Sequence, residues 1–500
     1  MEPETEAEII EDINIEQIKK RSVRGVLSLV GRRIVLRVLG QISFIFLARI
    51  LSPGDIGIFT IVSFVVNFFG FFSDIGLAAA LIQKKGELTK EDLRTTFTVQ
   101  QLLVGSLVLL TILLAPYLVH TFYANSLNES HIILIQVLAF SLLLASFKSV
   151  PSVILERKLE FNKLIWPEII ETLVYNILLV TMAYSGYGVW SFIVAVLARG
   201  IIGTAVIYAI APWPIGFKIN TRAFKQLYGF GIPYQLNSLI ALIKDNIIPT
   251  FVAATLGTNA VGIIGVGQKY AFLPLEIMGD IIRVTFPTYA RLQEHPELLK
   301  KALEKSLYFL ALAAYPALFG LIALIPWIAE YILSPRSNPT KWVPILPLFY
   351  LFTFSTFWAI LSTTFTNALF AIGKAKIVLN FMILWTILTW TLTPLATWKY
   401  GVNGVGIASA IISFTSIGVI VIMKRYVKVE IIKNIGPQLL MAVAMGILLR
   451  FLAISYLTNI FMLFVFVALG GVIYICGMYI ISGKRLVSEV KYIISAYKKK

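Results

Sequence analysis

Nine Lys and Arg side chains lie within or close to long apolar stretches of the sequence. They are Arg32, Arg33, Arg37, Lys148, Arg199, Lys244, Lys269, Arg283 and Arg450. The same stretches contain five acidic residues, which are Asp74, Glu171, Asp245, Glu276 and Asp280. A charge at the centre of a membrane helix costs about 2.5–3.5 kcal/mol on insertion scales, so helices turn such groups toward a hydrated cavity. The excess of cations therefore predicts a cavity that attracts an anionic ligand.

The spacing of these residues places several of them on shared helix faces. Arg33, Arg37 and Gln41 recur every four residues and form one stripe. A second stripe has offsets of 0, 7, 11 and 14 and consists of Lys269, Glu276, Asp280 and Arg283. Two further polar pairs are seven residues apart, Asn67 with Asp74 and Asn237 with Lys244.

Six cations are the candidate ligand-binding residues: Arg33, Arg37, Arg199, Lys244, Lys269 and Arg283. Four acids are candidates for binding a coupling proton or sodium ion, and the sequence does not select among Asp74, Asp245, Glu276 and Asp280. Structural alternatives remain open. Arg33 can snorkel to the membrane surface, and Arg37 can form a structural ion pair with Asp74. Glu276 and Asp280 can simply offset Lys269 and Arg283.

One apolar stretch is also rich in hydroxyl groups. It contains Ser355, Thr356, Ser362, Thr363, Thr364, Thr366 and Asn367. These side chains can hydrogen-bond sugar hydroxyls. Packing of helices through small polar residues is the alternative explanation.

The elements that position these residues are membrane helices. Of the 500 residues, 58% are hydrophobic and 14% are charged, and the mean hydropathy is +0.84. This composition excludes an ordinary soluble enzyme and a disordered chain. Apolar runs of about 20 residues predict an all-α polytopic membrane protein with about fourteen transmembrane helices. They lie near 26–48, 56–82, 97–119, 132–155, 166–184, 188–211, 228–254, 261–290, 306–333, 342–370, 377–397, 403–423, 436–457 and 459–481.

The net charge is +17, and the Lys and Arg residues are distributed unequally between the two sides of the predicted membrane. Thirty Lys and Arg fall in the tails and in loops on the side of the N-terminus, whereas the opposite loops contain only Arg49, Arg336, Lys341 and Lys399. The positive-inside rule places both termini in the cytoplasm. The expected location is the cell (plasma or inner) membrane. We therefore expect membrane lipids, and no nucleic acid, as partners. No cleavable signal peptide is expected, because the first 24 residues are acidic and polar.

An internal repeat relates the two halves of the chain. At a constant offset of 205 residues, four positions are identical: Ala48 and Ala253, Leu51 and Leu256, Gly57 and Gly262, and Ile58 and Ile263. Both segments fall at an expected outer turn, one after span 1 and the other after span 7. This spacing implies two pseudo-symmetric six-helix bundles that run in the same direction. Such repeats are typical of transporters that rock two halves about a central site. The expected parts are a cytoplasmic tail (1–24), an N-lobe with spans 1–6 (25–215), a C-lobe with spans 7–12 (216–425), spans 13 and 14 (426–482), and a basic tail (483–500).

Motifs for enzymatic chemistry are missing from the sequence. There is no P-loop, GxSxG, HExxH or CxxC, and the three histidines and single cysteine offer no metal-ligand cluster. We expect no catalytic residue, no metal and no cofactor. A membrane glycosyltransferase or ligase is the alternative from another class, although the loops are too short for an extramembrane catalytic domain.

Two segments carry a resemblance to a known family. Residues 47–57 read LARILSPGDIG, and Asp74-Ile75-Gly76-Leu77 is followed by Ala80-Leu81-Ile82-Gln83. Together with 155–161 and the Gly373-Lys374 turn, they resemble the polysaccharide transporter family of the multidrug/oligosaccharidyl-lipid/polysaccharide exporter superfamily. The resemblance implies fourteen helices in two lobes around a cavity that opens to one side at a time.

The resemblance also implies a substrate and a process. The substrate would be a polyprenyl-diphosphate-linked oligosaccharide repeat unit, moved from the inner to the outer leaflet for cell-surface polysaccharide synthesis, in company with polysaccharide polymerase machinery. The cationic candidates would then contact the diphosphate or acidic sugars. A lipid II-type flippase and an ion-coupled multidrug exporter of the same superfamily remain the alternatives.

Overall fold

The computed structural model describes residues 36–73, 77, 81, 88–158, 160–221 and 246–498. Within these ranges every regular element is a helix, which confirms the expected all-α class. Twelve helices in this part of the chain are long and apolar enough to cross a membrane. Three of the fourteen expected spans, 26–48, 56–82 and 228–254, extend outside the described residues.

The first helix that the structure describes in the first half spans residues 36–50. Those that follow are α2 (Pro53–Gly70), α4 (Lys90–Tyr117), α5 (Ile132–Phe147), α6 (Ser149–Arg157), α7 (Phe161–Tyr184) and α8 (Trp190–Ile210). Two short helical turns, η1 (Leu118–Phe122) and η2 (Glu129–His131), lie between α4 and α5.

The second half begins with the turn η3 (Ile248–Val252). Its helices are α10 (Ala253–Ala271), α11 (Leu273–Arg291), α12 (Pro296–Trp327), α13 (Ile345–Ala371), α14 (Ala375–Tyr400), α15 (Val402–Phe414), α16 (Ile417–Met423), α17 (Ile431–Tyr456) and α18 (Ile460–Lys498). The turn η4 (Ile328–Leu333) extends α12.

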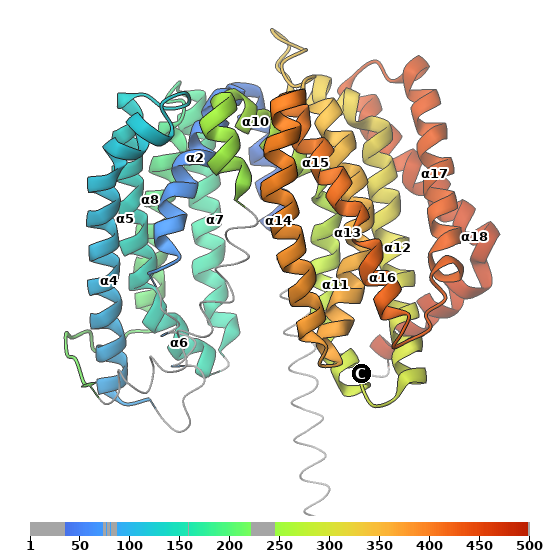
Figure 1. Cartoon of the computed structure of the whole chain (residues 1–500), viewed down its shortest axis with the longest axis horizontal. Coiled ribbons are helices and arrows are strands. Elements are labelled where there is room, and N and C mark those ends of the chain that lie inside the picture. The colour runs from blue at the N-terminus through green and yellow to red at the C-terminus, as the bar shows by residue number, and fades with distance from the viewer. Residues whose placement is uncertain are drawn as a thin grey trace, which may run out of the picture.

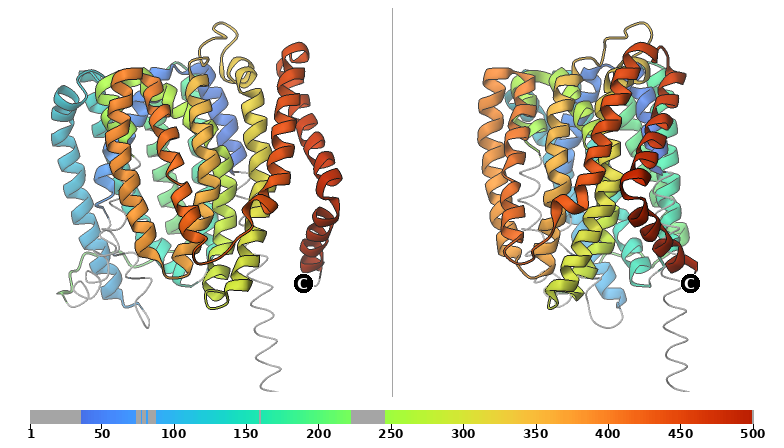
Figure 2. Two further views of the ribbon diagram at one scale, coloured as in Figure 1. Left: turned by 45° about the vertical axis from the view of Figure 1, so that its right-hand side comes forward. Right: turned by 90° about the vertical axis from the view of Figure 1, so that its right-hand side faces the viewer.

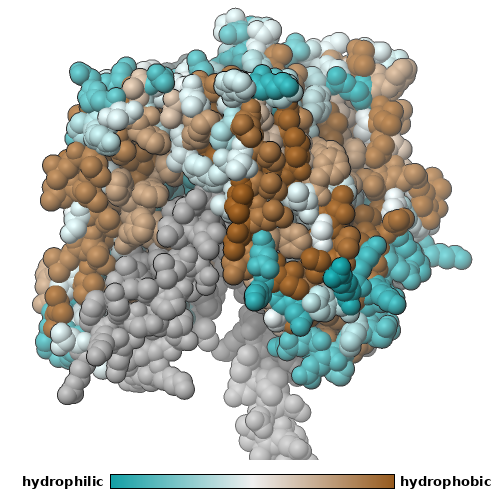
Figure 3. Space-filling model, in the orientation of Figure 1, coloured by the Kyte–Doolittle hydropathy of each residue, from teal (hydrophilic) through white to brown (hydrophobic). Residues whose placement is uncertain are grey.

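The helices form two groups that meet along α2 and α10 (Figure 1). We call the described helices from 36–50 to α8 the N-lobe, and those from η3 to α16 the C-lobe. Helices α17 and α18 stand outside the C-lobe, where α17 packs on α12 (Figures 1 and 2). A continuous apolar band covers the visible side of the C-lobe and α17–α18, with hydrophilic residues above and below it (Figure 3). This distribution fits a protein embedded in a bilayer.

Helix α2 begins at a capping box that falls within the segment 47–57. The Ser52 hydroxyl accepts a hydrogen bond from the Asp55 amide at 3.1 Å, and the Asp55 carboxylate accepts one from the Ser52 amide at 2.9 Å. Pro53 occupies the first helical turn, where its missing N–H costs nothing. The Ser-Pro-x-Asp pattern therefore has a local structural role, because it satisfies the free amides at the start of α2.

Helix α10 is interrupted by Gly257, whose φ of +82° is accessible to glycine at little cost. The break separates residues 253–256 from residues 258–271. The span expected near 261–290 is therefore built from the second part of α10 and from α11. The turn expected between the seventh and eighth spans is found at Gly257.

Candidate functional site

A cavity of about 570 Å³ lies between the two lobes. Its N-lobe wall comes from helix 36–50, α2, α7 and α8, and its C-lobe wall from α10 and α11. We call it the central cavity. Its charged lining residues in the described part of the chain are Arg37, Lys269 and Glu276. Cationic groups from both lobes thus face one space.

Two polar contacts join the lobes across the central cavity. The Arg37 Nε lies 3.5 Å from the Glu276 Oε2, and both side chains are about half-exposed. The Lys269 ammonium lies 3.2 Å from the centre of the Phe44 ring, where the negative face of the ring attracts it. Arg37 and Phe44 belong to the N-lobe, whereas Lys269 and Glu276 belong to the C-lobe. A ligand that binds these cations would therefore bridge the two lobes.

The structure brings together three of the residues predicted from sequence, Arg37, Lys269 and Glu276. Arg33, Asp74, Lys244 and Asp245 lie outside the described residues. For Asp280 and Arg283, the structure describes the backbone of α11 but not the side chains. These six assignments stay predictions.

Arg199 occupies a different position from Arg37 and Lys269. Its guanidinium carbon lies 5.5 Å from the centre of the Tyr175 ring, and Tyr175 lines the central cavity. Arg199 is exposed and is absent from the described residues that line the cavity. It therefore contacts a residue that lines the cavity without lining the cavity itself.

One intramembrane cation is neutralised within the N-lobe. The Lys148 ammonium donates a hydrogen bond to the Glu171 carboxylate at 2.7 Å, and both side chains are largely buried. Lys148 and Glu171 therefore do not contribute a net charge to the central cavity.

Several uncharged lining residues of the central cavity were not among the predicted site residues. They are Thr60, Thr172, Tyr175 and Asn176. Thr172 and Asn176 are four residues apart on α7, so helical spacing of polar residues would have indicated one face. Only the spatial arrangement of the helices shows that this face meets Arg37.

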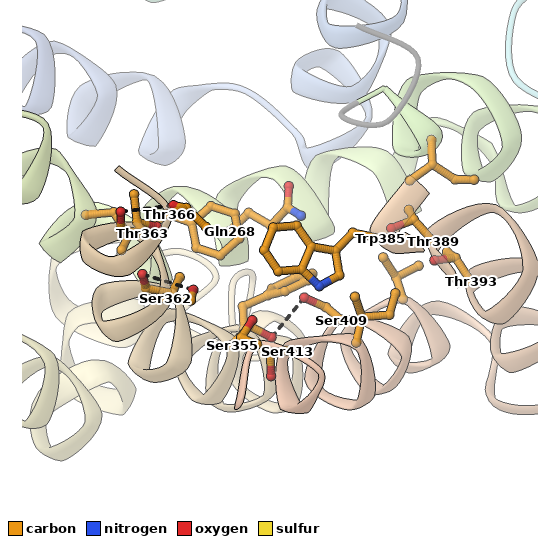
Figure 4. Close-up of a pocket in the computed structure, with 18 residues that line it drawn as sticks. Gln268, Ser355, Ser362, Thr363, Thr366, Trp385, Thr389, Thr393, Ser409 and Ser413 are labelled. Carbon is orange, nitrogen blue, oxygen red and sulfur yellow. Dashed lines mark hydrogen bonds between the residues drawn. The ribbon is translucent and has the colours of Figure 1, made fainter. Parts of the chain in front are cut away.

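A second cavity, of about 480 Å³, lies within the C-lobe, and we call it the C-lobe pocket. Its polar lining residues come from α10, α13, α14 and α15 and from the segment after α15 (Figure 4). They are Gln268, Ser355, Ser362, Thr363, Thr366, Thr389, Thr393, Ser409, Ser413 and Ser416. Trp385 provides an aromatic surface, and none of the described lining residues is charged.

The hydroxyl-rich stretch of α13 divides between this pocket and the protein interior. Ser355, Ser362, Thr363 and Thr366 line the pocket. Thr356 is fully buried and donates a hydrogen bond to the Ala271 carbonyl oxygen at 2.9 Å. Residues of the stretch therefore divide between cavity lining and helix packing, and the binding of sugar hydroxyls stays a prediction.

The lobes are joined at one end of the molecule, which we call the closed end. There the Lys341 ammonium and the Trp342 indole N–H both donate to the Ala48 carbonyl oxygen at 2.8 Å. The Arg49 guanidinium donates to the Tyr331 carbonyl oxygen at 3.0 Å. These hydrogen bonds connect the end of helix 36–50 to η4 and to the loop before α13.

Two glycines allow α2 and α10 to approach each other at the closed end. A methyl group at Gly57 would lie 1.9 Å from the Thr258 carbonyl oxygen, and one at Gly262 would lie 1.9 Å from the Pro53 carbonyl oxygen. The offset between Gly57 and Gly262, and between Pro53 and Thr258, is 205 residues in each case. The two contacts are therefore reciprocal, as an internal two-fold axis requires.

Comparison with known families identifies the chain. The family described as "polysaccharide biosynthesis protein" matches residues 46–346, more than half of the sequence. The chain belongs to this family. The resemblance read from residues 47–57 is thereby confirmed.

Three relatives of the chain have names that refer to surface polysaccharides or their gene region. An uncharacterized membrane protein of the cps region of Klebsiella pneumoniae is 25% identical over 69% of this chain and 70% of its own length. The teichuronic acid biosynthesis protein TuaB of Bacillus subtilis is 23% identical over 61% and 62%, respectively. The lipopolysaccharide biosynthesis protein WzxC of Escherichia coli is 22% identical over 66% of each chain.

Two solved structures share the fold. The lipid II flippase MurJ, in an inward closed conformation, has a TM-score of 0.75 and 16% identity, covering 91% of this chain and 98% of that one. An inward-facing multidrug resistance transporter of the MATE family and MOP superfamily has a TM-score of 0.59 and 14% identity, covering 78% and 95%. The chain is therefore a multi-span membrane protein with the fold of this superfamily.

Proposed function

We propose that this protein is a flippase. It would move polyprenyl-diphosphate-linked oligosaccharide repeat units from the inner to the outer leaflet of the cell membrane for cell-surface polysaccharide synthesis. The observation that carries the proposal is the central cavity, into which Arg37 and Lys269 extend from opposite lobes. Family membership and the names of the relatives support a lipid-linked glycan as the cargo.

The diphosphate would bind to the cationic groups of the central cavity. Charge-assisted hydrogen bonds from Arg and Lys are strong in a space that is only partly hydrated. Arg33, Lys244 and Arg283 are proposed to add to the Arg37 and Lys269 site. Arg199 would act through Tyr175, whose ring it contacts.

Coupling to a proton or sodium ion would involve a carboxylate near these cations. Glu276 is the acid that lines the central cavity among the described residues. Asp74, Asp245 and Asp280 remain candidates. A polysaccharide polymerase is proposed as the partner that receives the translocated lipid.

The cycle would proceed by alternating access. With both termini in the cytoplasm, as the charge distribution of the loops predicts, the closed end faces the outside. The structure then represents a state sealed toward the exterior. Parting of the closed end would release the ligand outward, and the substrate would leave chemically unchanged.

Transport by purified protein tests this function. Full-length protein in liposomes should translocate a fluorescent undecaprenyl-diphosphate trisaccharide without changing its mass. Arg37→Ala and Lys244→Ala should each reduce the rate by about tenfold or more, because a hydrogen bond to a charged group contributes about 1.5–3 kcal/mol. The control is Lys399→Ala, at an exposed position at the end of α14.

The outcomes separate the candidate functions. Normal transport by both Arg37→Ala and Lys244→Ala would refute the assigned site. A change in the mass of the lipid would indicate a glycosyltransferase or ligase. Ion-coupled efflux of organic cations, without transport of the lipid, would indicate a multidrug exporter.

A further inference from the structure

We infer that the C-lobe pocket is a binding subsite for uncharged sugar residues of the glycan. The inference rests on the proposed function and extends it, since it assigns the two parts of one ligand to two neighbouring cavities. The anionic diphosphate would occupy the central cavity, and neutral sugars would occupy the C-lobe pocket (Figure 4).

The two cavities share a wall formed by α10 and α11. Lys269 lines the central cavity, and its neighbour Gln268 lines the C-lobe pocket. On α11, Glu276 lines the first and Leu275 lines the second. The polarity therefore changes from charged to neutral across one helix layer, as it does along a lipid diphosphate that carries a neutral glycan.

Several hydroxyl groups of the pocket donate to their own helix and so present acceptors to the space. Ser413 donates its proton to the Ala410 carbonyl oxygen at 2.6 Å, and Thr366 donates to the Thr363 carbonyl oxygen at 3.0 Å. A hydroxyl that donates to its own helix still has lone pairs that accept. Sugar hydroxyls are numerous donors, so they complement this lining.

Trp385 is fixed in a position suited to a sugar ring. Its indole N–H donates to the Thr415 hydroxyl at 2.8 Å, and its ring packs beside Phe381 with centroids 5.6 Å apart. Figure 4 shows the ring among the hydroxyl groups of the pocket. An aromatic face is a natural platform for the C–H face of a pyranose, and apolar surface with a few placed polar groups is typical of ligand pockets.

The size of the pocket distinguishes it from hydroxyl-mediated helix packing. Thr356, on the same helix, shows the packed state, with no exposed surface and a hydrogen bond to α10. The pocket residues instead surround about 480 Å³ of space. Ligand pockets measure about 300–1,000 Å³, whereas one water occupies roughly 30 Å³.

Binding measurements with two lipids test the subsite. The probes are undecaprenyl diphosphate and the same lipid bearing a neutral trisaccharide of glucose and galactose, each titrated into the purified full-length protein. Wild type should bind the glycosylated lipid about tenfold more tightly than the bare lipid, as one or two neutral hydrogen bonds and a ring contact would give. Trp385→Leu and Thr389→Val should remove most of this gain and leave the affinity for the bare lipid unchanged.

Thr391→Val is the matched control. Thr391 is on α14 two residues from Thr389, is exposed, and donates to the Ile387 carbonyl oxygen at 2.8 Å. Loss of the Thr391 hydroxyl should not change the affinity of the protein for either lipid. Persistence of the full tenfold gain in both Trp385→Leu and Thr389→Val would overturn the subsite.

If Trp385→Leu does not fold, protection of a cysteine in the pocket from labelling tests the subsite instead. In a Cys476→Ser background, the glycosylated lipid should slow maleimide labelling of Ser409→Cys, and the bare lipid should not. Equal labelling with both lipids would refute the subsite alone. Failure of wild type to bind either lipid would instead overturn the proposed function, and the subsite with it.

Discussion

The contact between Arg37 and Glu276 joins the lobes only weakly. Both side chains are about half-exposed, and pairs of this kind contribute at most about 1 kcal/mol because water and salt screen them. A diphosphate carries more charge than one carboxylate and would displace Glu276 from the cations. Binding of the anionic group would then free Glu276 at the moment when the ligand arrives.

A change of Glu276 to glutamine tests this exchange. Glu276→Gln removes the competing carboxylate next to Arg37 and Lys269, so it should bind undecaprenyl diphosphate about threefold to tenfold more tightly than wild type. If Glu276 also carries the coupling ion, the transport rate in liposomes should fall at the same time. Weaker binding by Glu276→Gln would contradict the exchange, and Glu330→Gln, outside the central cavity, is the control.

Residues that line the two cavities were predictable from the sequence only where a charge or a run of hydroxyl groups marked them. Arg37, Lys269 and Glu276 are conspicuous because charges are costly in apolar stretches. Trp385, Thr389 and Ser409 carry no such signal, since aromatic and hydroxyl residues are common in membrane helices. Their meeting at one pocket depends on the packing of α13, α14 and α15, which no local spacing defines.

The starts of α2 and α10 determine how closely the lobes approach. Gly57 and Gly262 leave no room for a side chain against the opposite backbone. The family segment 47–57 is thus explained by helix capping and by lobe contact. It supplies no group to the described lining of the C-lobe pocket and only Leu47 and Ile56 to that of the central cavity.

Adding one methyl group at Gly57 should separate the lobes at the closed end. In Gly57→Ala the new carbon would lie 1.9 Å from the Thr258 carbonyl oxygen, so α2 and α10 must move apart. Spin labels at Tyr187 and Arg336, both exposed near this end, should report a longer distance. Gly262→Ala should act equally, and Gly105→Ala, where the methyl meets nothing within 4 Å, should not change the distance.

The loop before α13 should make the closed end sensitive to pH. Burial lowers the pKa of Lys341 to about 8, against the opposing effect of the Asp55 carboxylate. A hydrated lysine titrates near 10.4, so between these values the parted state binds more protons than the closed state. Raising the pH from 7.5 to 9.5 should therefore favour the closed state.

The same spin-label distance provides the measurement. Wild type should show a larger closed population at pH 9.5, and Lys341→Arg, which stays charged, should show no change over this range. A smaller closed population of wild type at pH 9.5 than at pH 7.5 would contradict the predicted direction of the pH effect.

The elements themselves were largely predictable, since long apolar runs define helices and Gly257 marks a turn. The merging of the end of one span with the start of the next into α10 was not predicted. Gly257 breaks the helix at a single residue, so composition does not separate the two parts.

At the scale of the whole molecule, two lobes enclose a cavity and are held together at one end. The 205-residue repeat predicted this relation, and the reciprocal glycine contacts match its register. The size of the central cavity, and the separate pocket in the C-lobe, could not be predicted. Cavities are the space that packing leaves, and a sequence defines the lining of a cavity more directly than its volume.

A reversible cross-link at the closed end tests whether the lobes must part. A methyl group at Gly54 would lie 3.1 Å from the Asn259 side chain, so cysteines at both positions can meet. In a Cys476→Ser background, Gly54→Cys/Asn259→Cys should lose transport under oxidising conditions and regain it with dithiothreitol. Either single cysteine should transport normally in both conditions. Full transport by the oxidised, cross-linked protein would rule out opening at this end.

The closed end is held mainly through main-chain acceptors. The donors are the side chains of Arg49, Lys341 and Trp342, and the acceptors are the Tyr331 and Ala48 carbonyl oxygens. The two glycines pack against the Thr258 and Pro53 carbonyl oxygens. Every residue type, proline included, carries a backbone carbonyl oxygen that can accept at such a position. In a saturation mutagenesis screen, most substitutions of Tyr331 should therefore be tolerated, whereas most substitutions of Trp342 should not. Homologues can thus differ in sequence at the acceptor positions and still form the closed end.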